Sequence, residues 1–385
     1  MNEYSEIHNE VIRIGADEKS AYWFAKKLNG FGISIRGVKC FAANIIKQEM
    51  LSKGADAVIN RECITGKTEY SDVLIVGKKE NIELACKKLF LQGELLSNIS
   101  KEILTVLKDV SLGRDKSFKC GKYILPLGKK TYIMGILNVT PDSFSDGGEA
   151  VSFEDAKRKA DLLVSQGADI IDVGGESTRP GYVTVEEVEE IERVTRIVEY
   201  IHNTYDIPIS IDTQKRNVAS EALRVGANIV NDIWGMQRED TTDLIVKYGA
   251  GVVLMHNKDN TVYSDIMPEI ISSLKGSVEK CLNKGVSFDN IVVDVGIGFG
   301  KDTEQNVEVL AHLEDLSVIG CPILLGTSRK SFIGNTLGIP VEERDEATVA
   351  TSVIGVMKGV DFVRVHNVEL TKKVLDMSDY ILRRS

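Results

Sequence analysis

The stretch ADIIDVGG, residues 168–175, combines a short apolar run with a polar, glycine-rich end. Such a run predicts a strand that is buried on both faces and ends in a loop. The same pattern occurs eight times along the chain, and longer amphipathic stretches separate the occurrences. The eight runs are TYIMGILNV from Thr131, ADIIDVGG from Ala168, IPISIDT from Ile207, ANIVNDI from Ala227, AGVVLMH from Ala250, IVVDVGIGFG from Ile291, CPILLGTS from Cys321 and VDFVRVHN from Val360.

Short apolar runs that alternate with amphipathic stretches are typical of βα units around a parallel sheet. Eight such units between residues 131 and 385 suit a closed (β/α)8 TIM barrel better than an open sheet. An open, doubly wound sheet remains the alternative, because a count of strands does not demonstrate closure. In both folds the functional loops follow the C-terminal ends of the strands.

Residues 1–118 show a different pattern and predict a small N-terminal α/β or α+β domain of unknown role. The mostly polar segment SLGRDKSF, residues 111–118, is the expected junction, so the barrel domain would span residues 119–385. Within the N-terminal domain we expect helices near residues 43–53, 80–91 and 95–110 and strands near residues 33–38 and 72–77.

The composition is that of an ordinary globular protein, with 43% hydrophobic and 27% charged residues in a chain of 385. The formal net charge of -10 argues against a nucleic-acid partner and does not attract anions from a distance. Any phosphate site must therefore be built locally. The sequence contains neither a signal-peptide pattern nor an apolar run of transmembrane length. We expect a cytoplasmic protein without a membrane partner, and a homodimer.

Two features of the sequence suggest special chemistry, but we interpret both as structural. The triplet Gly66-Lys67-Thr68 resembles part of a phosphate loop, yet Arg61 stands where that motif needs its first glycine, so a polar turn is expected. The cysteines are widely scattered and contain no CxxC pair, and a chain of this length can bury a core without disulfides. We interpret as reduced thiols the six cysteines Cys40, Cys63, Cys86, Cys120, Cys281 and Cys321.

Polar residues concentrate where the predicted strands end. Any single one could merely cap a helix or stabilise a turn. Eight together are better explained by convergence at one rim of the barrel, since the C-terminal ends of parallel strands meet there. These residues are Asn138, Asp172, Asp212, Asn231, Asp232, His256, Asp294 and His366.

Seven longer motifs carry a resemblance to a known family. They are ILNVTPDSFSDGG (residues 136–148), DVGGESTRPG (172–181), SIDT (210–213), VNDI (230–233), GIGFGK (296–301), TSRKSFIG (327–334) and RVHNV (364–368). In this order they resemble the successive signatures of the dihydropteroate synthases. The resemblance covers the barrel region. The N-terminal region resembles an extension of some bacterial members, for which no activity is implied.

The family joins 6-hydroxymethyl-7,8-dihydropterin pyrophosphate to p-aminobenzoate, giving 7,8-dihydropteroate and pyrophosphate in folate biosynthesis. A buried carboxylate can accept hydrogen bonds from the guanidine-like edge of a pterin, while amide and ammonium groups satisfy its acceptors. The resemblance implies Asp294, Asn231 and Lys330 for these roles. It adds Asp212 beside the ring, where a carboxylate would stabilise positive charge as the C–O bond breaks. Alternatively, Asp212 only orients the ring or a water.

The departing pyrophosphate calls for cations, and Mg²⁺ prefers oxygen ligands and keeps several waters. The resemblance places Asn138 on Mg²⁺ and puts Arg364 and His366, which lie two residues apart on one strand, on the phosphates. Ser331 opens a predicted helix and offers a site for the carboxylate of p-aminobenzoate. The residues implied to complete that pocket, on two loops expected to close over the substrates, are Asp142, Phe144, Thr178, Arg179 and Pro180.

Two departures from the family pattern and two alternative functions remain open. Val295 stands where the family usually has proline, which puts in question the rigidity of the pterin pocket. The loop NKDNTVYSDIM after His256 also lacks the usual motif. One alternative is a corrinoid-dependent methyltransferase, which shares the barrel and the strand-end Asp and Asn but needs no pyrophosphate site. The other is a catalytically silent pterin-binding or scaffolding protein.

Overall fold

A computed structural model describes residues 4–17, 24, 31–111, 117–139, 153–176 and 186–383 of the chain. The chain divides into two compact units, Met1–Leu112 and Gly113–Ser385.

The larger unit is a closed barrel of eight parallel strands, which confirms the predicted (β/α)8 fold and excludes the open sheet. Closure occurs where the last strand pairs with the first, with Val363 opposite Ile133. Each of the eight apolar runs contains one strand. The strands are β6 (Tyr132–Asn138), β7 (Ile170–Gly174), β8 (Ile209–Asp212), β9 (Ile229–Asp232), β10 (Gly251–Met255), β11 (Ile291–Asp294), β12 (Ile323–Leu325) and β13 (Phe362–Val365).

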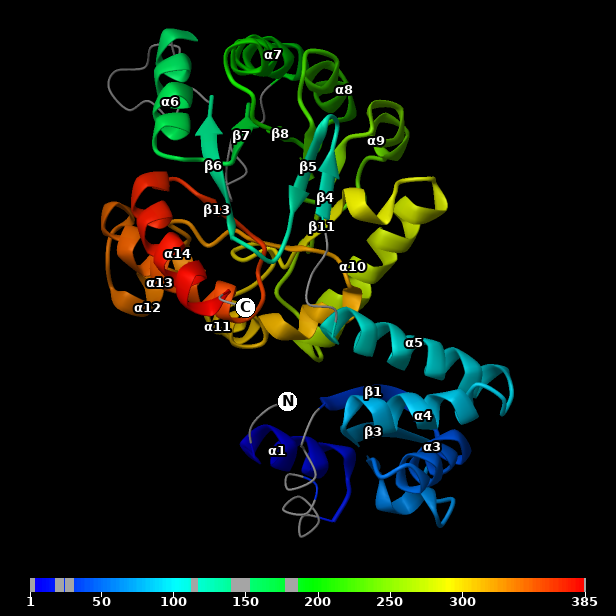
Figure 1. Ribbon diagram of the computed structural model, residues 1–385. Coiled ribbons are helices and arrows are strands. Elements are labelled where there is room, and N and C mark those ends of the chain that lie inside the picture. Colours follow the sequence, from blue (N-terminus) through cyan, green and yellow to red (C-terminus); the bar gives the residue numbers. More distant parts are fainter. Residues whose placement is uncertain are drawn as a thin grey trace. The chain divides into compact units, whose positions relative to one another are not determined.

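Helices surround the barrel (Figure 1). Because side chains alternate along a strand, one set packs outward against the helices and the other fills the barrel. In β7, for example, Ile171 belongs to the outer core and Ile170 to the interior, and both are fully buried. The helices are α6 (Phe153–Ser165), α7 (Glu187–Thr204), α8 (Arg216–Arg224), α9 (Thr242–Tyr248), α10 (Ile266–Asn283), α11 (Thr303–Ala311), α12 (Ser331–Leu337), α13 (Asp345–Met357) and α14 (Val368–Leu382).

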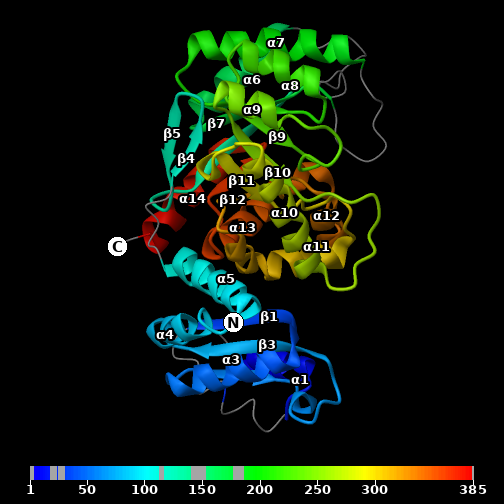
Figure 2. The same cartoon turned by 90° about the vertical axis from the view of Figure 1, so that its right-hand side faces the viewer.

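A β-hairpin closes the N-terminal end of the barrel. Its strands, β4 (Ser117–Cys120) and β5 (Tyr123–Pro126), lie on the side opposite to the β10–α10 loop (Figure 2). The Phe118 ring packs edge-on against Phe362 with centroids 5.5 Å apart, in one apolar cluster with residues from the starts of the strands. The expected boundary between residues 118 and 119 therefore falls inside an element that belongs to the barrel unit.

The N-terminal unit has its own antiparallel sheet in the order β1-β3-β2, which confirms a separate small domain of helices and strands. Helices pack on both sheet faces: alternate β3 residues such as Ile75 belong to the core with α3 and α4, whereas Leu74 packs in the cluster with α1. The sequence did not predict α1 and β2. The elements are α1 (Tyr4–Ile14), β1 (Phe31–Lys39), α3 (Cys40–Ser52), β2 (Asp56–Ile59), β3 (Tyr70–Gly77), α4 (Lys79–Leu89) and α5 (Glu94–Ser111).

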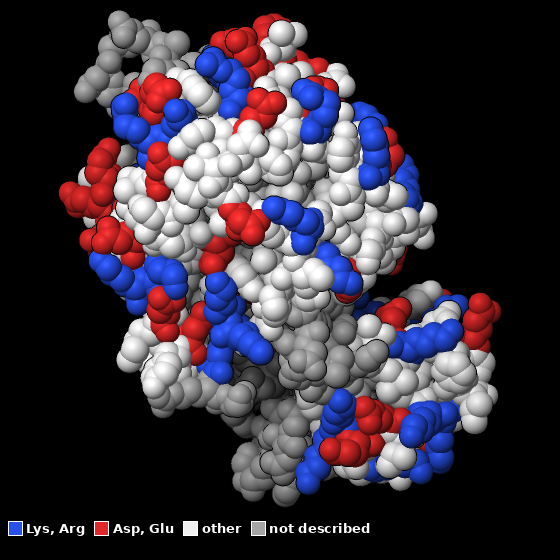
Figure 3. Space-filling model, turned by 45° about the horizontal axis from the view of Figure 1, so that its top comes forward, with Lys and Arg blue, Asp and Glu red and all other residues white. Residues whose placement is uncertain are grey.

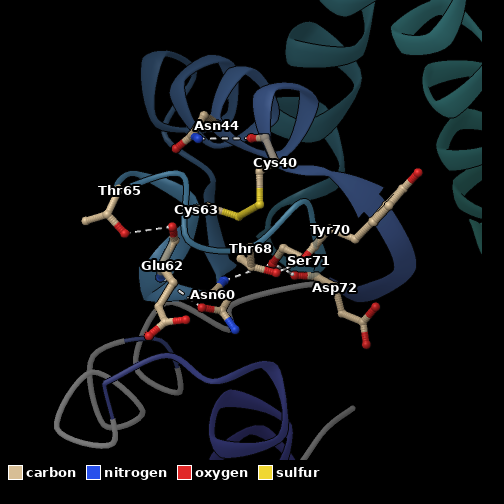
Figure 4. Close-up of a disulfide and its surroundings, with 10 residues drawn as sticks. All are labelled: Cys40, Asn44, Asn60, Glu62, Cys63, Thr65, Thr68, Tyr70, Ser71 and Asp72. Carbon is tan, nitrogen blue, oxygen red and sulfur yellow. Dashed lines mark hydrogen bonds between the residues drawn. A yellow bond between two sulfur atoms is a disulfide. The ribbon is translucent and has the colours of Figure 1, made fainter.

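The interpretation of all six cysteines as reduced thiols is wrong for two of them. Cys40 at the start of α3 and Cys63 form a disulfide, with Cα atoms 5.1 Å apart (Figure 4). The pairing arises because the end of β1 is bonded to the chain just before β3, where the Cys40 N–H donates to the Glu69 carbonyl at 2.9 Å. The four other cysteines are free and buried.

The Gly66-Lys67-Thr68 triplet forms a turn, as the sequence predicted. The turn precedes β3, and the Thr68 hydroxyl donates to the Tyr70 carbonyl at 2.9 Å (Figure 4). In the part of the chain that the structure describes, no helix is long and apolar enough to cross a membrane. On the face shown in Figure 3, Lys and Arg residues are interspersed with Asp and Glu residues.

Candidate active site

The C-terminal rim of the barrel collects the polar strand-end residues that the sequence singled out. Asp172, Asp212 and Asn231 lie on the adjacent strands β7, β8 and β9, and Asp212 stands opposite Asn231 in the strand register. Asp294 ends β11. All four side chains are buried, and Asp172 is fully inaccessible. The structure therefore brings together three of the four residues predicted to surround the pterin, with Asp172 as an additional member.

Arg364 of β13 forms ion pairs with two of these carboxylates, Asp172 and Asp212. Its Nε lies 2.6 Å from Asp172 Oδ2, and its Nη2 lies 2.6 Å from Asp212 Oδ2. Asn231 Nδ2 lies 3.4 Å from the same oxygen of Asp172. The proximity of the two carboxylates raises the pKa of Arg364, so the guanidinium stays charged. Arg364 was predicted to contact phosphate. At least two of its nitrogen atoms, Nε and Nη2, instead donate to Asp172 and Asp212.

The second oxygens of these two carboxylates have no partner among the described residues. Asp172 Oδ1 and Asp212 Oδ1 are both buried without a hydrogen bond. Burial raises the pKa of Asp212 to about 7, although the positive charges of Arg364 and Lys330 oppose the shift. Buried acceptors are normally satisfied, so these oxygens are candidates for donors supplied by a ligand.

Asp294 is fixed by the turn that follows β11. Its Oδ1 accepts a hydrogen bond from the Gly296 N–H at 2.7 Å, and burial raises its pKa. Gly296 has φ +69° and packs so closely on the His256 carbonyl that an added Cβ would stand 2.0 Å from that oxygen. Val295 is fully buried in the outer core. The turn is therefore constrained by glycine geometry and core packing at the point where the family usually has proline.

Lys330 faces the same region from the loop after β12. Its Nζ lies 4.0 Å from the centroid of the Phe299 ring, which the β11–α11 loop contributes. Gly298 lies beneath the lysine stem, where a Cβ would approach Lys330 Cδ to 3.0 Å. The positive charge of Lys330 lowers the pKa values of both Asp212 and Asp294 against the effect of burial. Its position thus fits the predicted pterin pocket.

Lys301, a buried lysine for which the sequence predicts no role, holds the β11–α11 loop. Its Nζ lies 3.1 Å from His256 Nδ1 and donates to the carbonyls of Gly296 and Phe299 at 3.1 and 3.0 Å. Burial lowers the Lys301 pKa to about 7. Lys301 ends the GIGFGK motif, but no sequence signal distinguishes a buried loop anchor from a surface lysine.

His366 and Arg364 were expected to grip phosphate from one face of a strand, but they have different protein partners. β13 ends at Val365, so His366 lies just beyond it. Its Nδ1 lies 2.8 Å from Ser328 Oγ, and its backbone N–H donates to the same oxygen at 3.1 Å. Ser331 is the first residue of α12, as the sequence predicted, and it is exposed.

Asn138, the expected Mg²⁺ ligand, ends β6 and is half-buried. Its Oδ1 and Asp212 Oδ2 lie 3.4 and 3.9 Å from the point where a Cβ would stand on Gly174. Among the described residues, no group of three His, Cys, Asp or Glu side chains could hold a metal. Asp232 accepts from the N–H groups of Trp234 and Met236 and so stabilises a turn. Asp142, Phe144, Thr178, Arg179 and Pro180 lie outside the described residues.

Comparison with known proteins identifies the family of the barrel unit. Residues 134–366 match the pterin binding enzyme family. A dihydropteroate synthase from Clostridium beijerinckii is 52% identical over 268 residues, which are 69% of this chain and all of the relative. A Clostridium difficile dihydropteroate synthase crystallised with pteroic acid is 51% identical, with a TM-score of 0.65 over 67% of this chain and 99% of that one.

A third relative extends the comparison to a bound aromatic acid. The Xanthomonas albilineans dihydropteroate synthase with 4-aminobenzoic acid is 35% identical, with a TM-score of 0.67 over 70% of this chain and 99% of that one. The family match begins at residue 134, so the N-terminal unit lies outside it. Identities at this level favour the synthase over the corrinoid-dependent methyltransferase. The chain therefore belongs to the dihydropteroate synthases of the pterin binding enzyme family.

Proposed function

We propose that this protein joins 6-hydroxymethyl-7,8-dihydropterin pyrophosphate to p-aminobenzoate and releases pyrophosphate. The observation that carries the proposal is the buried rim in which Asp212 Oδ1 and Asp172 Oδ1 have no donor among the described residues while Arg364 binds the opposite oxygens. Buried carboxylates with unused acceptor capacity suit a ligand edge that is rich in N–H groups, such as that of a pterin.

The pterin would lie between the acidic strands and Lys330. Asp294 is buried and keeps Oδ1 on the Gly296 N–H, which leaves acceptor capacity for ring N–H groups. Asn231 can both donate and accept at the ring edge. The Lys330 ammonium, held over Phe299, would satisfy a ring acceptor. These assignments were implied by the family resemblance, and the positions of the described side chains support them.

The chemical step is a displacement at the pterin CH₂. The amine nitrogen of p-aminobenzoate forms a bond to this carbon, the C–O bond breaks, and its electron pair leaves with pyrophosphate. The amine proton goes to the leaving group or to water, since a neutral arylamine needs no strong base. Positive charge that develops on the pterin would be stabilised by Asp212, because a fixed carboxylate in a buried site costs little reorganisation.

The leaving group would be held by Arg364, His366 and Mg²⁺. The single half-buried carboxamide of Asn138 fits Mg²⁺, which usually keeps several waters and binds substrate phosphates rather than a cage of protein ligands. When bound, Mg²⁺ would neutralise charge on the departing pyrophosphate. The p-aminobenzoate carboxylate would lie near Ser331, and the residues proposed to complete its pocket are Asp142, Phe144, Thr178, Arg179 and Pro180.

A turnover assay tests the proposal. Purified protein with Mg²⁺, the pterin pyrophosphate and p-aminobenzoate should release pyrophosphate and form dihydropteroate in equal amounts, and a chelator should slow the reaction. Methyl transfer from methyltetrahydrofolate to a corrinoid protein, or pterin binding without pyrophosphate release, would contradict it. A homodimer is part of the same proposal, and sedimentation analysis of the full chain tests it.

A further inference from the structure

We propose that Asp345, the first residue of α13, is a positioning residue that acts through Arg329 on the side chains of Ser328 and Lys330. The inference rests on the proposed function for its kinetic test, but its structural basis is independent of turnover. Asp345 lies at the start of α13, and its described side-chain hydrogen bonds are with Arg329 and Asn367 rather than with Asp172, Asp212 or Asp294.

Arg329 has an unusual backbone conformation. Its φ of +56° lies in the left-handed region, which side chains with a Cβ rarely adopt. Among the described residues other than glycine, only Met236 shares this property. A non-glycine residue remains in such a conformation only when its surroundings hold it there, and such residues cluster at functional sites.

Helix α13 and the residue before it provide those constraints. Arg329 Nε and Nη2 bind the two oxygens of Asp345 at 2.6 and 2.8 Å. The Arg329 N–H donates to Thr348 Oγ1 at 3.1 Å, and its carbonyl accepts from Arg344 Nη1 at 3.1 Å. The N–H, the carbonyl and the side chain of Arg329 are therefore all held by α13 and the residue that precedes it.

The residues on either side of Arg329 are functional candidates. Ser328 contacts His366, whose Nδ1 lies 2.8 Å from its hydroxyl, and Lys330 lies over the Phe299 ring. Because Arg329 turns the chain between them, its conformation decides where both side chains point. A relaxed Arg329 would move the Ser328 hydroxyl or the Lys330 ammonium away from these contacts.

Asp345 also reaches the strand end that carries His366. Its Oδ2 accepts from Asn367 Nδ2 at 3.0 Å, so one carboxylate ties the loop after β12 to the chain after β13. The hydrogen bond with Arg329 lowers the pKa of Asp345, and Asn367 acts in the same direction. The carboxylate is therefore ionised at neutral pH, as a bidentate arginine contact requires.

The kinetic test measures the effect of substituting Asp345 in two backgrounds, wild type and Arg329→Gly. Asp345→Ala should raise the KM for the pterin pyrophosphate and lower kcat/KM about tenfold. Glycine adopts a φ of +56° without strain, so in an Arg329→Gly background the same substitution should lose only the contact with Asn367 and change kcat/KM less than threefold. Unchanged kcat/KM in Asp345→Ala, or equal losses in both backgrounds, would overturn the proposal. Asp345→Asn serves as the second variant if Asp345→Ala fails to fold.

The structural test uses ¹⁵N-histidine NMR of the unliganded full chain. The chain has five histidines, and a His366→Asn variant assigns the His366 signals. Asp345→Ala should shift the Nδ1 signal that reports the contact with Ser328, and an unmoved signal would overturn the proposal. The matched control is Asp243→Ala, because Asp243 makes a similar bidentate contact with Arg216 on the barrel exterior. This control should leave the His366 signal unchanged. If wild type forms no dihydropteroate, the proposed function fails while this test still decides the role of Asp345.

Discussion

The two ends of the barrel bury the same eight strands in opposite ways. At the N-terminal end, Phe118 of the hairpin packs on Phe362 in an apolar cluster. At the C-terminal rim, the buried groups are charged, and Arg364 lies between Asp172 and Asp212. Apolar burial stabilises a fold in proportion to area, whereas a buried ion pair often contributes little net stability because its charges lose hydration.

This difference indicates that the closed end stabilises the barrel and that the rim serves ligand binding. The rim also contains two buried carboxylate oxygens, Asp172 Oδ1 and Asp212 Oδ1, without a partner among the described residues. Apolar residues at these two positions would bury no such oxygen. Substitutions at the closed end should therefore change stability without changing binding, and substitutions at the rim should change binding most.

The largest effect is expected from Phe118→Ala. Loss of a fully buried aromatic ring typically costs about 3–5 kcal/mol, and Phe118 is 1% exposed. Urea unfolding of the barrel unit measures this loss, and the KM values of the folded fraction should stay unchanged. The control is Ile124→Ala on the same hairpin, because Ile124 is 62% exposed. A wild-type unfolding midpoint for Phe118→Ala would contradict the structural role of this end.

Arg364→Ala should combine both kinds of effect. It would leave Asp172 and Asp212 buried without their counter-ion, which costs about 3 kcal/mol of unfolding free energy, the low end for a buried pair, because Arg364 is 18% exposed. It should also impair use of the pyrophosphate. Adding Asp172→Asn should restore part of the stability but not turnover. Full turnover in Arg364→Ala would separate this residue from the site.

Asp294→Ala should weaken pterin binding by about 2 kcal/mol, roughly 30-fold, as expected for loss of a hydrogen bond to a charged group. Calorimetric titration with pteroic acid measures the change. Stability should change little or increase, since a buried carboxylate with a raised pKa disfavours the folded state at high pH. Equal affinity in wild type and variant would remove the assignment of Asp294. The same comparison for Lys330→Ala tests the opposite side of the pocket.

The smallest expected effect is on the pH profile. Burial raises the Asp212 pKa to about 7, so the carboxylate is ionised above that pH and protonated below it. If ionised Asp212 stabilises the transition state, kcat/KM should fall as pH drops below about 7, by roughly tenfold per unit. Asp212→Asn should have lower activity and lose this acidic limb. A limb that persists in Asp212→Asn would belong to another group.

Much of the fold could be predicted because the apolar pattern of buried parallel strands is local. Each of the eight runs contains a strand, and the predicted convergence of Asp212, Asn231 and Asp294 follows from parallel pairing. The hairpin at residues 117–126 was missed because its strands have four residues each and sit beside a polar junction. Helix α1 was missed because acidic residues interrupt its apolar positions.

The contacts that define the site could not be predicted. Asp172 received no role because nothing in its own segment shows that a guanidinium 192 residues later would bind it. The Cys40–Cys63 disulfide was missed because the two residues share no motif, and their approach depends on how β1 and β3 pair. The left-handed backbone of Arg329 is likewise set by Asp345 and its neighbours on α13 rather than by a local glycine.

The sequence by itself determined the eight βα units and the strand ends at which the polar residues lie, because the apolar pattern of a buried strand is a property of short segments. Only the tertiary structure decided that the sheet closes, which charges are paired, which buried oxygens lack a partner among the described residues, and which helix residues hold the loop that carries Ser328 and Lys330. Those properties depend on distances between segments far apart in the chain, and the energies of hydrogen bonds and buried charges change steeply with such distances.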